Sequence, residues 1–161
     1  MTIIAYKDGV IAADTLAMNG SLNMGFVCKV TRNKAGDLAG SSGDLGWCQA
    51  FNQWFEEGED GPMPTMTYAT ETSDQGLVVR KGKPGAVWVL YSHKFPPCRI
   101  VIHKSAGFAI GSGKAEAMGA MHAGGNAIEA VKAAITLDDS CGGDINVISL
   151  SGARRTIKIG R

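Results

Sequence analysis

Short apolar runs separated by turn residues fill the first part of the chain, and the first two predict a hairpin. Residues 3–6 and 10–13 are apolar, and the dipeptide Asp8-Gly9 separates them. Asp-Gly between two β-prone runs is a strong signal for a two-residue hairpin turn. With this dipeptide at the tip, counting along the strands places Asp14 opposite Ile3 and Thr2 opposite Thr15.

The remaining apolar pattern predicts further strands and three helices. Helical spacing from residue 45 to 55 follows the glycine-rich stretch 40–43, which we expect to be a tight loop, and an acidic Gly/Pro loop follows at 56–66. Two later helices are expected at 114–123 and 127–137. The expected strands are residues 26–30, 37–39, 77–80, 87–91, 99–103, 108–110, 145–150 and 156–159. Strands and helices do not alternate strictly, so antiparallel sheets with helices on their outer faces are favoured over a parallel sheet.

Composition narrows the class of protein. The 161 residues are 45% hydrophobic, enough for one domain over residues 1–161 with a real core. Lys plus Arg number 16 and Asp plus Glu number 15, which argues against nucleic-acid or membrane-surface partners. The four scattered cysteines predict reduced thiols, and the first residues lack a signal-peptide pattern. We therefore expect a cytoplasmic protein.

Several familiar site motifs are excluded by single residues. The Gly-Ser-Gly-Lys run at 111–114 is not a phosphate loop, because Phe108 stands where the first glycine is needed and Ala115 where Ser or Thr is needed. Ser41 and Ser42 do not form a nucleophile elbow, since neither is centred between glycines in that pattern. The three histidines share no metal-ligand spacing. We expect neither a metal nor a cofactor.

The most informative position is the threonine directly after the first methionine. Removal of Met1 would leave Thr2 with a free α-amine, whose ordinary pKa of ~7.7–8.0 suits a general base. The hydroxyl of the same residue could then act as the nucleophile. Such a site needs a cation near the amine and a carboxylate to hold that cation. Lys29 and Asp14 are the candidates.

Five sequence blocks resemble proteasome β-type subunits and the related bacterial two-component protease. They occur in family order and span nearly the whole chain: TIIAYKDGVIAADT, FVCKV, LAGSSGD, AIGSG and LDDSCGGDINVISL. This resemblance implies an α+β fold, the four-layer αββα sandwich of N-terminal nucleophile hydrolases. Because the stretch 56–75 leaves no room for the family's long second helix, we expect a compact variant with a shortened helical layer.

The resemblance also implies roles for individual residues in a threonine-type endopeptidase. Thr2 would attack the peptide carbonyl, Lys29 would tune the α-amine, and Asp14 would orient Lys29. A backbone amide near Ser41 would bind the oxyanion. The residues that would support the amine are Ser112 and Asp138.

Partners follow from the same resemblance. It implies a homo-oligomeric ring with active sites facing an inner chamber, peptides or unfolded proteins as substrates, and an ATP-driven unfoldase as partner. Two positions depart from the family pattern. Cys141 stands three residues after Asp138, where Ser or Thr is usual, and a thiol is a weak hydrogen-bonding group. Ser41 stands where many members have glycine.

Three functions remain open from the sequence. Aligning the first strand with the family places Met1 at the nucleophile position and Thr2 one residue later, which would inactivate the site. A shift or bulge in either strand of the hairpin would bring Thr2 into place. The chain is therefore an active threonine peptidase, an inactive proteasome-fold ring or scaffold protein of phage-related type, or an N-terminal nucleophile amidase acting on small amides.

Overall fold

The computed structural model describes residues 2–66, 74–93, 96–103 and 106–159. Its strands are β1 (Ile3–Lys7), β2 (Val10–Asp14), β3 (Leu16–Asn19), β4 (Leu22–Phe26), β5 (Val30–Arg32), β6 (Leu38–Ser42), β7 (Gln75–Val79), β8 (Ala86–Tyr91), β9 (Cys98–Val101), β10 (Phe108–Gly111), β11 (Ile145–Ser149) and β12 (Arg154–Ile157). Its helices are α1 (Leu45–Glu56), α2 (Lys114–His122) and α3 (Ala127–Leu137).

The predicted N-terminal hairpin is confirmed, including its register. Asp8 and Gly9 form the turn with φ angles of +49° and +80°, the left-handed values that a tight hairpin turn requires. Ile4 pairs with Ala13, and continuing this pairing by one residue places Ile3 opposite Asp14. The first strand therefore delivers residue 2 to the end of the hairpin beside the Asp14 carboxylate.

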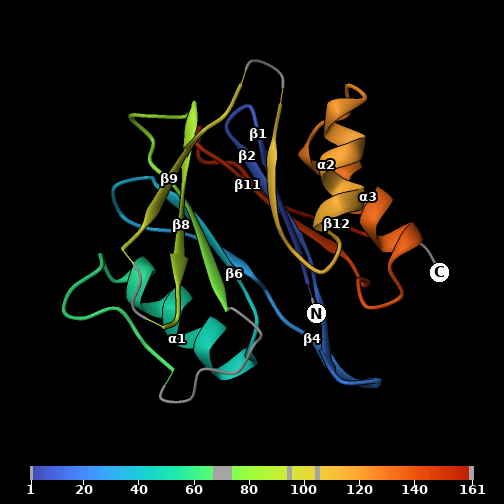
Figure 1. The fold of residues 1–161 in the computed structure, drawn as a ribbon, viewed down its shortest axis with the longest axis horizontal. Helices are drawn as coiled ribbons and strands as arrows, with labels where there is room; N and C mark the ends of the chain where they lie inside the picture. The colour runs from blue at the N-terminus through green and yellow to red at the C-terminus, as the bar shows by residue number, and fades with distance from the viewer. Residues whose placement is uncertain (1, 67–73, 94–95, 104–105, 160–161) are drawn as a thin grey trace.

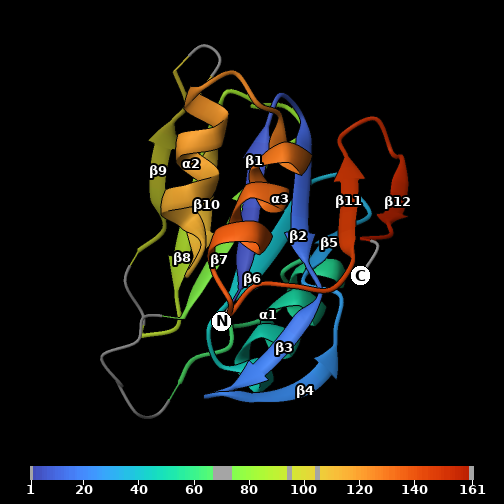
Figure 2. The same ribbon diagram turned by 90° about the vertical axis from the view of Figure 1, so that its right-hand side faces the viewer.

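Two five-stranded antiparallel sheets pack against each other (Figure 1). The first has the strand order β10-β1-β2-β11-β12, and the second has the order β5-β6-β7-β8-β9. Side chains alternate along β1, so Ile4 and Tyr6 are buried between the sheets while Ile3 and Ala5 face the helices α2 and α3. A third, two-stranded sheet of β3 and β4 extends away from this pair, at the lower edge of Figure 2.

Each helix packs through a face set by its sequence. In α1 the aromatic residues Trp47, Phe51 and Phe55 are buried against the second sheet, and the Asp44 side chain caps the helix by accepting from Trp47 N at 3.0 Å. Helices α2 and α3 present mainly alanines to the first sheet, which permits close packing. All three helices lie where the apolar spacing predicts them.

The four-layer αββα sandwich expected from the resemblance is wrong for this chain. The described residues form three antiparallel sheets, and their three helices are short, with 12, 9 and 11 residues. Residues 154–156 of β12 and Val101 of β9 remain exposed, so neither sheet carries a complete helical layer. The reason is local: the Gly- and Pro-containing acidic stretch after α1 forms neither helix nor strand in its described residues 57–66.

Two further local expectations need correction. The stretch 40–43 is not a loop, because Gly40 to Ser42 belong to β6 and pair with β7. The sequence pattern also did not predict β3, which pairs with β4 across a turn at Gly20. No helix in the described part of the chain has the length and apolar content needed to cross a membrane.

Candidate active site

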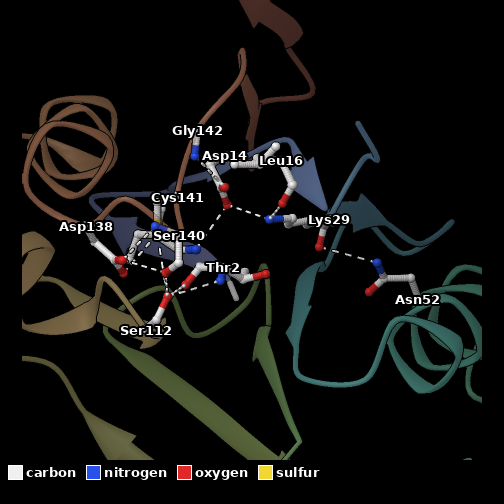
Figure 3. A network of polar contacts seen from close by, with 11 residues as sticks. Thr2, Asp14, Leu16, Lys29, Asn52, Ser112, Asp138, Ser140, Cys141 and Gly142 are labelled. Atoms are coloured by element: carbon white, nitrogen blue, oxygen red, sulfur yellow. Dashed lines mark hydrogen bonds and ion pairs between the residues drawn. The ribbon is translucent and has the colours of Figure 1, made fainter. Parts of the chain in front are cut away.

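A buried ion pair lies at the end of the hairpin (Figure 3). The Lys29 ammonium, just before β5, lies 2.7 Å from Asp14 Oδ1, and Asp14 is fully buried. Asp14 Oδ1 also accepts from Ile3 N at 3.0 Å, and its Oδ2 accepts from Gly142 N at 3.0 Å. These hydrogen bonds fix the carboxylate, so the position of the Lys29 cation is fixed as well.

The Lys29 side chain is held near the N-terminal end of β1. Its Nζ donates a second hydrogen bond, of 2.7 Å, to Leu16 O. Thr2 and Lys29 are 5% and 6% exposed, and both line one small cavity of about 40 Å³. Uncharged residues complete this cavity, chiefly from the β3–β4 region and α1: Ala17, Met18, Val27, Cys28, Ser41, Gly43, Leu45, Cys48, Gln49 and Asn52. The cavity therefore brings a single cation next to the predicted nucleophile.

A second polar network reaches Thr2 from the other side. Thr2 N donates to Ser112 Oγ at 3.3 Å, and Ser112 Oγ lies 3.3 Å from Thr2 O. Ser112 can approach so closely because Gly111 precedes it: Gly111 has φ +106°, and a Cβ there would lie 2.0 Å from Thr2 O. The Gly-Ser-Gly turn after β10 therefore places a hydroxyl on the backbone of Thr2.

Asp138 supports Ser112 through a residue that sequence reasoning missed. Ser140 Oγ lies 3.0 Å from Ser112 Oγ and donates to Asp138 Oδ1 at 2.5 Å, while Ser140 N donates to the same oxygen at 2.9 Å. Burial alone would raise the pKa of Asp138, but hydrogen bonds, chiefly those from the side chain and backbone of Ser140, outweigh it and lower the pKa to about 2. Asp138 is therefore an anion at neutral pH and can only accept hydrogen bonds.

Cys141 is a weak member of this network. Its Sγ lies 3.4 Å from Asp138 Oδ2 and 3.7 Å from Ser112 Oγ. Burial, followed by the negative charge of Asp14, raises the pKa of this thiol to about 12. The side chain is consequently a neutral thiol whose one proton is directed at Asp138.

The backbone amide predicted near Ser41 for the oxyanion is not that of Ser41 itself. Its backbone N–H is not available to an oxyanion, because it donates to Lys29 O at 3.2 Å in the pairing of β5 with β6. The Ser41 hydroxyl donates to Asn52 Oδ1 at 3.0 Å, and Asn52 Nδ2 donates to Lys29 O at 3.3 Å. Ser41 and Asn52 thus fix the backbone of Lys29, and the sequence signal for Asn52 was only a polar position in an apolar helix.

The structure thus places all six predicted site residues in polar networks around one site: Thr2, Asp14, Lys29, Ser41, Ser112 and Asp138. Gly142 joins the two networks through the backbone, which a sequence pattern does not reveal. The predicted removal of Met1 concerns a residue outside the described ranges. No group of three or more His, Cys, Asp or Glu side chains suited to a metal ion occurs within those ranges.

Comparisons with known proteins address the fold. Neither the scan against protein-family models nor the search of curated proteins found a match. Among solved structures, the chain is similar to that of Thiobacillus denitrificans BPH in complex with epoxomicin. The two sequences are 18% identical, the similarity covers 99% of each chain, and the TM-score is 0.62. At this identity the likeness shows a shared fold and assigns no activity.

Proposed function

We propose that this chain is a proteasome-related threonine-type peptidase, in which Thr2 becomes the nucleophile once Met1 is removed. The observation that carries the proposal is the position of Thr2 between two polar networks. On one side it shares a cavity with Lys29, whose ammonium is paired with the buried Asp14, and on the other its nitrogen is hydrogen-bonded to Ser112. A nucleophile with an adjacent base and an oriented support is the usual constellation for covalent catalysis.

In the first chemical step, Thr2 Oγ attacks the peptide carbonyl carbon, and its proton passes to the neutral α-amine of the same residue. The Lys29 cation favours the developing alkoxide, since a nearby positive charge stabilises the ionised form of a hydroxyl. Ser112 Oγ, placed on Thr2 N, accepts a hydrogen bond from the ammonium that forms. The tetrahedral intermediate then holds a new Thr2 Oγ–carbon bond.

In the second step, the ammonium returns its proton to the leaving peptide nitrogen, and the carbon–nitrogen bond breaks. This leaves an ester on Thr2. Water, deprotonated by the now neutral amine, attacks the ester carbon. The Thr2 Oγ–carbon bond then breaks, the ammonium returns its proton to Thr2 Oγ, and the carboxylic acid is released. Asp14 does not touch the substrate in this scheme. It positions Lys29 and balances its charge in the buried site.

The hairpin shows no shift or bulge, yet its contacts favour Thr2 over Met1 as the nucleophile. Asp14 accepts from the nitrogen of Ile3, and the residue directly before Ile3 is the one whose nitrogen contacts Ser112. That residue is Thr2. Further support comes from the similarly folded T. denitrificans protein, whose solved structure contains epoxomicin, a proteasome inhibitor.

Labelling with epoxomicin tests the proposal directly. Intact-mass measurement of the purified full chain should show loss of Met1 and a mass increase equal to one epoxomicin. Thr2→Ala should abolish both the adduct and the hydrolysis of fluorogenic peptides. Thr136→Ala, an exposed position on α3, is the matched control and should leave both unchanged.

The other two functions give different results in the same experiment. Retention of Met1 in native material, with no adduct and no turnover, would favour an inactive scaffold protein. Loss of Met1 with hydrolysis of small amides but not of peptides would favour an amidase. Either result would overturn the peptidase proposal.

The proposal extends to assembly into a homo-oligomeric ring that encloses the sites, takes peptides or unfolded proteins, and works with an ATP-driven unfoldase. Support comes from β4, whose three large apolar side chains, Leu22, Met24 and Phe26, are all more than half exposed. A group of exposed apolar side chains of this kind is typical of contact surfaces. Native mass spectrometry tests the assembly, and a stable monomer would contradict it.

A further inference from the structure

We infer that Ser140 is a positioning residue that fixes the direction of the hydrogen bond between Ser112 and Thr2. The inference rests on the proposed function, because it explains how the Thr2 amine would be supported during peptide hydrolysis. It concerns a residue to which the sequence motifs assign no role. Its basis is the chain of contacts from Asp138 through Ser140 and Ser112 to Thr2 N.

The direction of this chain follows from the charge of Asp138. The ionised carboxylate carries no proton, so Ser140 Oγ must donate in the 2.5 Å contact with Asp138 Oδ1. A serine hydroxyl has one proton, and that of Ser140 is now used. In the 3.0 Å contact between the two hydroxyls, Ser140 therefore accepts and Ser112 donates.

Ser112 is oriented in consequence. Its single proton points to Ser140, so its oxygen presents lone pairs to Thr2 N at 3.3 Å. Without Ser140, the same hydroxyl could turn and donate to Thr2 O, which lies at the same distance of 3.3 Å. In this second orientation, the Ser112 proton points to the Thr2 carbonyl instead of to Ser140. Ser112 Oγ is then a weaker acceptor for a hydrogen bond from the Thr2 amine. Ser140 selects the first orientation.

Cys141 cannot perform this task in the native chain. Its sulfur is 3.7 Å from Ser112 Oγ, compared with 3.0 Å for the Ser140 hydroxyl, and sulfur is a weak acceptor. The thiol lies beside the same Asp138 carboxylate and close to Ser112. A hydroxyl introduced at position 141 would face the same two groups and, after a small shift of the loop, replace that of Ser140. This arrangement provides a rescue experiment.

The test compares Ser140→Ala with the double variant Ser140→Ala/Cys141→Ser. The single variant should lower kcat for a fluorogenic peptide by about 10-fold to 100-fold, the loss expected when one hydrogen bond to a charged group is removed. KM should stay close to the native value, because Ser140 touches no substrate. The double variant should recover most of the lost kcat. Ser151→Ala, in the exposed turn after β11, is the control and should change neither constant.

Two measurements make the positioning role distinguishable from a merely structural one. The pH profile of kcat should shift to lower pH in Ser140→Ala, because the ammonium loses its oriented acceptor, and should return in the double variant. Carbon-13 NMR titration of the Asp138 carboxyl should show its pKa rising towards the ordinary value in Ser140→Ala. This second measurement needs no turnover.

The outcomes separate the inference from the proposed function. If the native chain hydrolyses no peptide, the proposed function fails, and the NMR titration alone decides whether Ser140 is bonded to an ionised Asp138. An unchanged Asp138 pKa in Ser140→Ala would overturn the inference. An unchanged kcat in Ser140→Ala would also overturn the inference. So would a loss of kcat in Ser140→Ala that the added Cys141→Ser change does not recover.

Discussion

The Lys29 ammonium and the Asp14 carboxylate lie 2.7 Å apart in a buried position, although fifteen residues separate them in the sequence. Asp14 ends the second strand of the hairpin, and Lys29 precedes the first strand of the opposite sheet. The pair therefore joins the two sheets at the edge where Thr2 lies. Its effect on stability and on catalysis can be measured separately.

Asp14→Ala should lower the free energy of unfolding by about 3–5 kcal/mol, because it leaves the Lys29 cation buried without its counter-ion. Chemical denaturation monitored by circular dichroism measures this loss. Asp144→Ala is the matched control, since it removes an ion pair with the exposed Lys158 and should cost far less. Equal losses in the two variants would contradict the assignment of Asp14 to a buried pair.

Lys29→Met should lower kcat by at least about 100-fold while keeping the apolar volume of the side chain. The reason is that the cation lining the same cavity as Thr2 is lost. Peptide turnover at saturating substrate measures the effect, and Lys158→Met provides an exposed lysine control. Full turnover in Lys29→Met would show that the cation has no part in activating Thr2.

The lowered pKa of Asp138 predicts a specific acid sensitivity. The folded-state pKa of about 2 lies below the ordinary value of 3.8, so the ionised carboxylate stabilises the fold. That contribution is complete above the ordinary value and is lost as the pH falls through about 2. Acid unfolding followed by circular dichroism should therefore shift to higher pH in Ser140→Ala.

Asp139→Asn changes the neighbouring carboxylate, which makes none of the hydrogen bonds described for Asp138, and it serves as the control for acid unfolding. It should leave the transition close to that of the native chain. A shift in Asp139→Asn as large as that in Ser140→Ala would assign the acid sensitivity to general charge in the loop.

Gly111→Ala should disrupt the contact between Ser112 and Thr2. The new Cβ would lie 2.0 Å from Thr2 O, at a backbone φ of +106° that favours glycine. We expect reduced stability and loss of turnover. Gly119→Ala tests the same substitution in α2, where nothing lies within 4 Å of the new Cβ, and should stabilise the chain by about 0.5–1 kcal/mol.

Local patterns were sufficient for much of this fold. The hairpin and its register could be predicted because Asp8-Gly9 restricts the turn, and α1 could be predicted because Trp47, Phe51 and Phe55 recur at helical spacing. The architecture as a whole could not be predicted from local patterns. Its third sheet depends on the pairing of β3 with β4, and most residues of these two strands are exposed or half-buried, so no core-facing pattern indicates them.

In the candidate site, too, some features were predictable from the sequence and others were not. Thr2, Asp14 and Lys29 could be proposed from residue chemistry and from a resemblance, because each needs only its side chain. Which amide near Ser41 could bind an oxyanion was not predictable, because the N–H of Ser41 itself is engaged by the pairing of β5 with β6, and the sequence does not show that pairing. Ser140 was missed because only the folded loop places its hydroxyl between Ser112 and Asp138.

The loop from Asp138 to Gly142 has a wider consequence. Ser140 contacts Ser112, while two residues later Gly142 donates to Asp14 and accepts from Thr15 N and Leu16 N at 3.1 and 2.9 Å. A displacement of these few residues would disturb both Ser112, which accepts a hydrogen bond from Thr2 N, and the Asp14–Lys29 pair. Both polar networks around Thr2 thus depend on the position of one short loop.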